Sequence, residues 1–324
     1  RPFRNQKILN RKIFSVFIIL SLFLIVFMAF RVIKSGGYVD RLPPILQSDL
    51  SERPWTFNKT KDGKLCYGWY GKDKFCSFGP SDSDKNLFVI GDSNMETISS
   101  ALINVFAPKG YRITTMNSSA CYFIPNSFSG TDGNPRVIAN EPCDESFQTL
   151  RLRELTKTSN NLLIVGGMLD VYLKQDGLGF ESSNNVSIRD NFVENIRALV
   201  SQGTKVALVY PYPRAKENIG KLAFEELSNA NPADLTSLRK HVETLRAATA
   251  YETSEFMLYS KEAFELLDSI ESENIIRIYP HQLFCDDKTC NFLSDNSLHV
   301  VDYNHPSSFF ASNCDFSSFI TEFF

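Results

Sequence analysis

An uncharged apolar run of 18 residues, IFSVFIILSLFLIVFMAF at positions 13–30, sets the strongest limit on how this chain can fold. With its flanks, a helix of that length crosses the hydrocarbon core of a bilayer. A cleaved signal peptide is the alternative, but its apolar region would be shorter, and small residues suited to cleavage should follow it. Here RVIKSGG follows. We therefore expect a retained transmembrane helix over 13–33.

Positively charged residues are more numerous before this run than after it. Before it stand Arg1, Arg4, Lys7, Arg11 and Lys12. After it come Arg31, Lys34 and Arg41. Because cytoplasmic flanks carry the excess of Lys and Arg, we expect a cytoplasmic flank over 1–12 and an extracytoplasmic remainder.

Seven cysteines agree with an oxidising compartment, either the periplasm or the cell exterior. Neighbours along the sequence suggest disulfides Cys66–Cys76, Cys121–Cys143 and Cys285–Cys290, which leaves Cys314 odd; other pairings stay open. Each bridge would close a short loop and so stabilise local geometry. The metal alternative is weak, because no C-x-x-C pair exists and the four histidines are scattered. We expect no metal site.

The pattern beyond the apolar run predicts an α/β domain. Residues 34–85 are polar and irregular, which is typical of an extracytoplasmic linker or extension. From 86 onward strands and helices alternate. Expected strands are 86–91, 111–116, 161–166, 205–210 and 275–279. Expected helices are 94–107, 190–202, 237–251 and 260–272. Near-continuous apolar strands between helices indicate a parallel sheet covered on both faces. The net charge of −3 argues against a nucleic-acid partner.

A helix-rich polar stretch, 212–260, is longer than a connection between two strands needs. We interpret it as a helical insertion. It could be a lid or rim over the sheet edge, or a plain solvated insertion.

The first expected strand runs straight into Gly91-Asp92-Ser93. Ligands of open parallel sheets sit at the carboxyl ends of the strands, so this turn lies where a site would form. A serine there could attack a carbonyl while backbone N–H groups at the helix N-terminus stabilise the oxyanion. The same geometry also favours Ser93 as an ordinary helix cap. The segment alone does not decide between them.

A base for Ser93 must come from one of four histidines. His241 lies in a polar helical pattern, His281 has no evident orienting acid, and His299 sits in a short strand-like segment. His305 differs because Asp302 stands three residues ahead of it. In a tight loop the carboxylate could bind Nδ1–H and leave Nε2 free to take a proton from a serine. A surface turn is the alternative.

Together, the two motifs resemble the SGNH/GDSL hydrolase superfamily, with its nucleophile in Gly-Asp-Ser and an Asp-x-x-His near the C-terminus. The flank RPFRNQKILNRK before the apolar helix is similar to the end of the integral-membrane acyltransferase-3 domain. SACYFIP, CDDKTC and DYNHPSS resemble further motifs of the SGNH domains fused to it. The resemblance implies a three-layer α/β/α sandwich with a central parallel sheet over 86–324.

The resemblance also implies a function. The chain would be the C-terminal part of an O-acyltransferase of the bacterial inner membrane, with its catalytic domain in the periplasm. It would acetylate a cell-surface polysaccharide such as lipopolysaccharide O-antigen. The acetyl donor, derived from acetyl-CoA, would be supplied through the membrane-embedded acyltransferase-3 domain, and this part would bind no cofactor.

Carried over by position, Ser93 would be the nucleophile, His305 the general base and then acid, and Asp302 its orienting partner. The sequence departs from the pattern at two positions. Asn94 stands where the subgroup often has His. Leu169 occupies the place of the oxyanion-hole Asn, and a Leu side chain donates no hydrogen bond.

A backbone N–H near Gly166 or Gly167, or the side chain of Asn117, could take over the oxyanion role. Two other functions stay open at this stage. A glycan O-acetylesterase would use the same residues with water as acceptor. A non-catalytic glycan-binding domain is the other, motivated by Asn94 and Leu169.

Overall fold

The computed structural model describes most of the chain from residue 75 onward and the apolar segment near its start. The described residues are 11–34, 46, 66, 75–125, 127–131, 134–135, 137–138, 141–158, 161–174, 180–182, 187–228, 230, 234–294, 297–307 and 311. Cys314 lies outside them.

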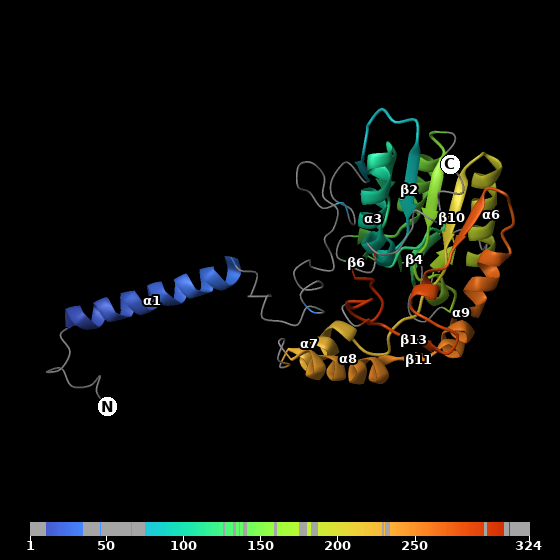
Figure 1. Ribbon diagram of the computed structural model, residues 1–324. Coiled ribbons are helices and arrows are strands. Elements are labelled where there is room, and N and C mark those ends of the chain that lie inside the picture. The colour runs from blue at the N-terminus through green and yellow to red at the C-terminus, as the bar shows by residue number, and fades with distance from the viewer. Residues whose placement is uncertain are drawn as a thin grey trace.

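The apolar run forms one helix, α1 (Arg11–Lys34). Its window Phe14–Lys34 is long and apolar enough to cross a membrane, and none of it is buried against the rest of the protein. In Figure 1 it extends away from the folded body. This confirms an apolar N-terminal helix where the sequence predicts one.

The centre of the fold is a six-stranded sheet in the order β1-β3-β2-β8-β10-β12. Its strands are β1 (Cys76–Phe78), β3 (Arg112–Thr115), β2 (Asn86–Ile90), β8 (Leu162–Val165), β10 (Lys205–Val209) and β12 (Ile275–Ile278). All neighbours are parallel except β1, which pairs antiparallel with β3. Along the chain, the strand order reverses between β2 and β8. Such a switch point is where open α/β sheets bind ligands.

Alternate residues of the buried strands feed two separate cores. On β2, Leu87 and Val89 join the core under α3 (Ser93–Phe106), while Phe88 and Ile90 join the core on the other face. That second face is covered by α4 (Glu145–Leu155), α6 (Ile188–Ser201) and α9 (Thr253–Asp268). Figure 1 shows the sheet between α3 on one side and α6 and α9 on the other. The predicted three-layer arrangement is confirmed.

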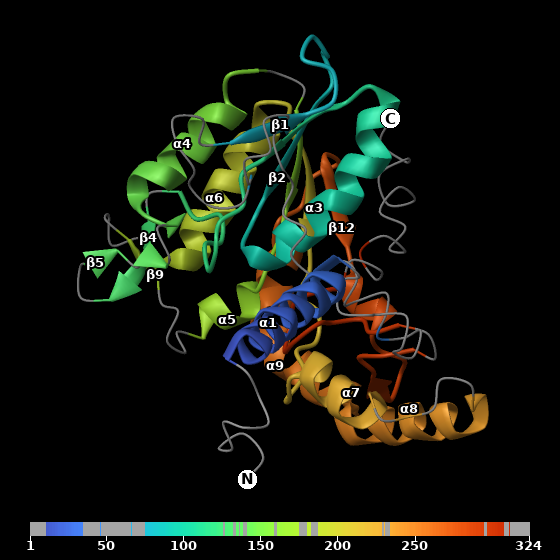
Figure 2. The same cartoon turned by 90° about the vertical axis from the view of Figure 1, so that its left-hand side faces the viewer.

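Two helices, α7 (Ile219–Leu227) and α8 (Leu235–Thr249), lie at the end of the sheet where the parallel strands finish (Figures 1 and 2). Their buried residues join the same core as α3. They come from the stretch predicted as a helical insertion. In the fold they sit beside the carboxyl edge, where the site is built.

The remaining elements are short. They are η3 (Ala107–Lys109), β4 (Ser127–Thr131), β5 (Asn134–Pro135), β6 (Val137–Ile138), β7 (Glu141–Pro142), α5 (Leu169–Leu173), β9 (Phe180–Ser182), β11 (Tyr251–Glu252), η4 (Pro280–Leu283) and β13 (Thr289–Cys290). β4 pairs with β5 and β9, β6 with β7, and β11 with β13.

The sheet begins earlier in the chain than the sequence predicts. Edge strand β1 comes from the segment expected to be linker, and the disulfide Cys66–Cys76 holds its first residue. The disulfides Cys121–Cys143 and Cys285–Cys290 are also present. Three residues are too few for a periodic pattern, which is why β1 escapes a sequence-based prediction.

Candidate active site

Ser93 is the first residue of α3, and the helix is capped by its neighbour. Asp92 is the N-cap, and its Oδ1 accepts a hydrogen bond of 2.9 Å from the Asn94 N–H. Ser93 Oγ therefore has no capping role. It lies 2.8 Å from Nε2 of His305 instead. The helix cap is therefore Asp92, and the Ser93 hydroxyl faces the His305 ring.

His305 is oriented by Asp302 in a tight loop. Its Nδ1 lies 2.7 Å from Asp302 Oδ2, and its backbone N–H donates to Asp302 Oδ1 at 2.9 Å. The Asn304 N–H donates to the same oxygen at 3.0 Å. One carboxylate thus fixes both the loop and the ring. With the proton on Nδ1, Nε2 is left as the acceptor facing Ser93 Oγ.

The segment after β10 braces this loop from behind. The Ala215 N–H donates to the carbonyl oxygen of Tyr303 at 2.7 Å, and the Ile219 N–H donates to that of Asp302 at 3.2 Å. Within the loop, the Val301 N–H donates to the His305 carbonyl at 3.0 Å. The predicted insertion thus begins by holding the loop that carries the base.

Asp302 is kept ionised by its surroundings. Partial burial acts to raise the pKa of this carboxyl group. The hydrogen bond and positive charge of His305, together with the N–H groups of Asn304 and His305, outweigh burial and leave the pKa below its ordinary value. An ionised Asp302 stabilises the imidazolium that forms when Nε2 takes a proton.

A second carboxylate, Asp92, is buried and holds the nucleophile turn through its hydrogen bonds. Besides capping α3, its Oδ2 accepts from the Met168 N–H at 2.8 Å and from the Tyr172 hydroxyl at 3.0 Å. The β8–α5 turn lies directly against it. A Cβ on Gly167, which has a φ of +127°, would lie 2.6 Å from Asp92 Oδ2. Only glycine allows this approach.

Two backbone N–H groups near the nucleophile turn are not used by the described part of the fold. The Ser93 N–H lies in the unpaired first turn of α3, and the Gly167 N–H follows β8 at the switch point. Neither donates a hydrogen bond within the described part of the chain. An oxyanion hole needs such uncommitted donors, so both N–H groups stay candidates for that role. Gly167 was among the sequence-based candidates, while the Gly166 N–H donates to the Ile90 carbonyl.

Asn117, the other oxyanion candidate, is a correction. Its Nδ2 donates to Glu96 Oε2 at 2.9 Å and to Ser99 Oγ at 2.8 Å, so both amide hydrogens are already used. The side chain is buried and ties β3 to α3. Leu169, at the place of the family's Asn, is fully buried in the core beside α4 and α6.

Asn94 joins the two halves of the site. It is fully buried, and its Oδ1 accepts from Asn304 Nδ2 at 3.1 Å. This bond links the residue after the nucleophile to the residue before the base. Sequence reasoning singled out Asn94 only as a departure and missed Asn304, because 210 residues separate the two.

Arg151 is a further residue that sequence reasoning missed. From α4 it reaches the nucleophile turn, where Nη2 donates to the Gly91 carbonyl at 3.1 Å. Nη1 donates to the carbonyls of Cys121 and Tyr122 at 3.1 and 3.2 Å. The side chain is fully buried and its guanidinium lies over the Phe147 ring. It connects the turn before Ser93 to the loop that the Cys121–Cys143 disulfide closes.

The surroundings of the other three histidines differ from those of His305. His241 Nδ1 pairs with Glu226 on α7 at 2.7 Å and is partly exposed. Burial lowers the pKa of His281 and of His299. Among the described residues, no three His, Cys, Asp or Glu side chains gather where they could hold a metal ion.

Comparison with known proteins places the chain in one family. A family model described as "SGNH domain (fused to AT3 domains)" matches residues 60–315. A search of curated proteins finds no match.

Solved structures resemble the chain more loosely. One is the periplasmic domain of a lipopolysaccharide acetyltransferase from Salmonella ser. Paratyphi A, with 16% identity, a TM-score of 0.48, and coverage of 81% of this chain and 91% of that one. Another is a carbohydrate acetylesterase from Sinorhizobium meliloti, with 14% identity, a TM-score of 0.31, and coverage of 70% and 93%. A third is a protein from Bacteroides fragilis NCTC 9343 described as a "putative acylhydrolase", with 12% identity, a TM-score of 0.32, and coverage of 75% of this chain and 88% of that one. At these values the likenesses carry no functional argument.

Proposed function

This chain belongs to the family of SGNH domains fused to AT3 domains, and from that premise we propose that it is an extracytoplasmic O-acyltransferase. It moves an acetyl group through Ser93 onto a sugar hydroxyl of a cell-surface polysaccharide such as lipopolysaccharide O-antigen. The observation that carries the proposal is the continuous series of contacts from Ser93 Oγ to His305 Nε2 and from His305 Nδ1 to Asp302.

The reaction follows from these contacts. His305 Nε2 takes the proton of Ser93 Oγ as that oxygen attacks the acetyl carbonyl. The tetrahedral oxyanion accepts hydrogen bonds from the Ser93 and Gly167 N–H groups. As the intermediate collapses, Nε2 returns the proton to the group that leaves the donor. The acceptor hydroxyl then loses its proton to Nε2 and attacks the acetyl-serine, and the proton returns to Ser93 Oγ as the ester bond breaks.

The family and the α1 helix support a membrane setting. An AT3 domain, in the same polypeptide, is the partner we propose for delivery of an acetyl group derived from acetyl-CoA. Helix α1 would cross the bacterial inner membrane, and the domain from residue 75 onward would face the periplasm. Three disulfides suit that oxidising side.

Glycan acetylation in cells tests the proposal. Complete protein carrying Ser93→Ala or His305→Ala is expressed, and the O-acetyl content of the purified polysaccharide is measured by NMR against wild type. Each variant should lower acetylation by on the order of 10²-fold or more. Ser201→Ala, at an exposed helical position, and His241→Ala, at a partly exposed one, serve as matched controls. Full acetylation in both Ser93→Ala and His305→Ala would refute the proposal.

An acetylesterase would use the same contacts with water as the acceptor. The fusion to AT3 domains favours transfer over hydrolysis. Purified chain incubated with a soluble acetyl ester separates the two. Slow turnover that depends on the membrane domain supports transfer, and fast turnover without it supports an esterase.

A further inference from the structure

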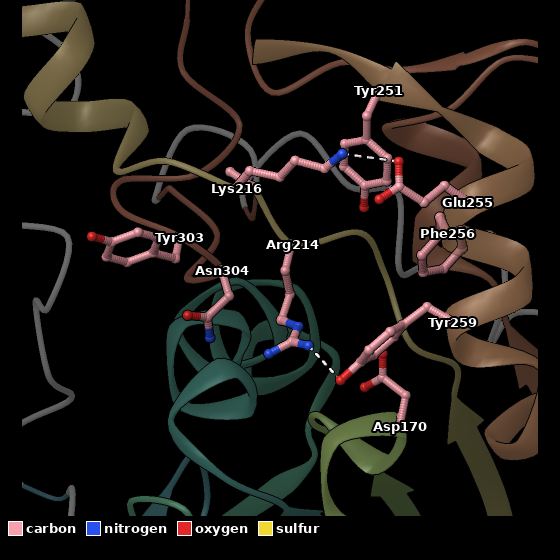
Figure 3. Close-up of a pocket in the computed structure, with 10 residues that line it drawn as sticks. Asp170, Arg214, Lys216, Tyr251, Glu255, Phe256, Tyr259, Tyr303 and Asn304 are labelled. Carbon is pink, nitrogen blue, oxygen red and sulfur yellow. Dashed lines mark hydrogen bonds and ion pairs between the residues drawn. The ribbon is translucent and has the colours of Figure 1, made fainter. Parts of the chain in front are cut away.

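A cavity of about 400 Å³ adjoins the loop that carries His305. Its lining comes from α5, from the segment after β10, from β11 and α9, and from Tyr303 and Asn304 of the loop itself (Figure 3). Asn304 is bonded to Asn94, which follows Ser93. One lining residue, Asn304, thus directly precedes the base His305 in the sequence, and its bonded partner directly follows the nucleophile. Its size suits a small ligand.

Arg214 is one of four charged residues that line this cavity. Figure 3 shows it between Tyr303 and Tyr259, and its Nη2 donates to the Tyr259 hydroxyl at 2.6 Å. Its guanidinium carbon lies 5.0 Å from the centre of that ring. In the described ranges, no carboxylate forms an ion pair with Arg214. Its side chain is oriented but its charge is not neutralised by direct contact.

The two acids that line the cavity are engaged elsewhere. Glu255 pairs with Lys216 at 2.9 Å. Asp170 is buried, with Oδ1 accepting from the Val171 N–H and Oδ2 from the Ser260 hydroxyl, both at 3.0 Å. Burial raises the pKa of Asp170, and the nearby Arg214 only partly offsets this effect.

A second cation contacts the aromatic ring that orients Arg214. Lys174 Nζ lies 3.5 Å from the centre of the Tyr259 ring. The aromatic walls supplied by Tyr251, Phe256 and Tyr303 offer flat apolar surface against which the face of a sugar ring can lie.

We propose that this cavity is the acceptor subsite and that it selects a sugar bearing a carboxylate or a phosphate, which binds Arg214. This inference rests on the proposed function, because it names the substrate class of the same site. A guanidinium fork matches either oxyanion in a bidentate arrangement, and Tyr259 holds it ready. A sugar seated there borders Asn304, beside the base that must receive the proton of its hydroxyl.

Ligand binding to the full chain in detergent tests this subsite. Saturation-transfer NMR titrations compare galacturonate with neutral galactose, and a further arm with galactose 6-phosphate separates the carboxylate from the phosphate. Galacturonate or the phosphate ester should bind at least tenfold more tightly than galactose. Arg214→Gln should remove that preference, and Arg153→Gln, an exposed position on α4, should keep it.

Tyr259→Phe gives a milder variant that retains the ring and removes the hydroxyl that orients Arg214. It should weaken the binding of the anionic sugar by a few-fold and leave galactose binding unchanged. Equal binding of the acidic and neutral sugars to wild type, or an unchanged preference in a folded Arg214→Gln chain, would overturn the inference.

Ser93→Ala separates this result from the fate of the proposed function. That variant lacks the nucleophile but keeps the cavity, so it should bind the anionic sugar as wild type does. Selective binding without reaction of Ser93 with a fluorophosphonate would refute the acyltransferase and keep the anionic subsite. Reaction at Ser93 without selective binding would refute the subsite alone.

Discussion

Replacement of Gly167 by Ala tests how closely the β8–α5 turn is fitted to the nucleophile turn. Gly167 has a φ of +127°, and an added Cβ would lie 2.6 to 2.9 Å from the carboxylate atoms of Asp92. Asp92 cannot yield freely, because its oxygens bind the Asn94 and Met168 N–H groups and the Tyr172 hydroxyl. Either the turn or the carboxylate must move.

The expected loss of stability has two parts. A non-glycine residue in such a backbone conformation costs roughly 1–3 kcal/mol. Displacing Asp92 removes the α3 cap, worth about 1 kcal/mol, and two further hydrogen bonds worth about 1 kcal/mol each. Gly167→Ala should therefore lower the free energy of unfolding by roughly 4–6 kcal/mol. Gly110 and Gly203 also have positive φ, but a Cβ there meets nothing within 4 Å. Their Ala variants should lose only the backbone part.

Urea unfolding of the purified chain, followed by circular dichroism, measures these differences. The rate of fluorophosphonate labelling at Ser93 then reports whether the turn has moved. If Gly167→Ala does not fold, Asp92→Ala tests the same hydrogen bonds without the backbone strain, and should lose about 2–4 kcal/mol. A Gly167→Ala chain no less stable than the Gly110→Ala and Gly203→Ala controls would refute the close fit.

Three further predictions concern Asp302, Arg151 and Asn117. The contacts of Asp302 with His305 outweigh burial and lower its pKa, so ionised Asp302 stabilises the fold. The difference in unfolding free energy between wild type and Asp302→Asn should therefore shrink as pH falls through that lowered pKa. Urea unfolding at a series of pH values measures this difference. A difference independent of pH would contradict this. Arg151→Gln leaves the Gly91 carbonyl without its donor. The free energy of unfolding should therefore fall by roughly 2–4 kcal/mol, and labelling of Ser93 should slow. Wild-type values of both quantities would be evidence against a positioning role for Arg151. Asn117→Ala should lower the free energy of unfolding by about 1–2 kcal/mol and leave the labelling rate of Ser93 nearly unchanged. Labelling slowed by on the order of 10²-fold, as expected for a lost oxyanion donor, would instead support Asn117 as that donor.

Much of the fold follows from the sequence because burial leaves a periodic pattern. Strand β2 is a short apolar run ended by Gly91, and β8 has the same form, ended by Gly166. Strands β10 and β12 are also mostly apolar. The edge strand β1 has no such pattern. It is defined by pairing with β3 and by a disulfide to Cys66, which a local pattern does not reveal.

The candidate site divides in the same way. Asp302 and His305 are three residues apart, so their contact could be expected from the motif alone. The contacts that support Ser93 join distant segments: Arg151 lies 60 residues from Gly91. Packing of α4 against the sheet brings them together, and packing is not encoded in any short stretch. Asn117 shows the reverse error, since a plausible residue type after a strand turns inward to Glu96.

The most direct test of the central claim is to trap the acyl-enzyme. Membranes that contain the complete protein are given the acetyl donor but no acceptor polysaccharide. The reaction is quenched with acid, the protein is digested, and the peptides are mapped by mass spectrometry. The account predicts one acetyl group on the peptide containing Ser93, lost when acceptor is added and absent in Ser93→Ala. Acetylated polysaccharide formed by a Ser93→Ala chain, or wild-type transfer with no acetyl group ever found on Ser93, would contradict it.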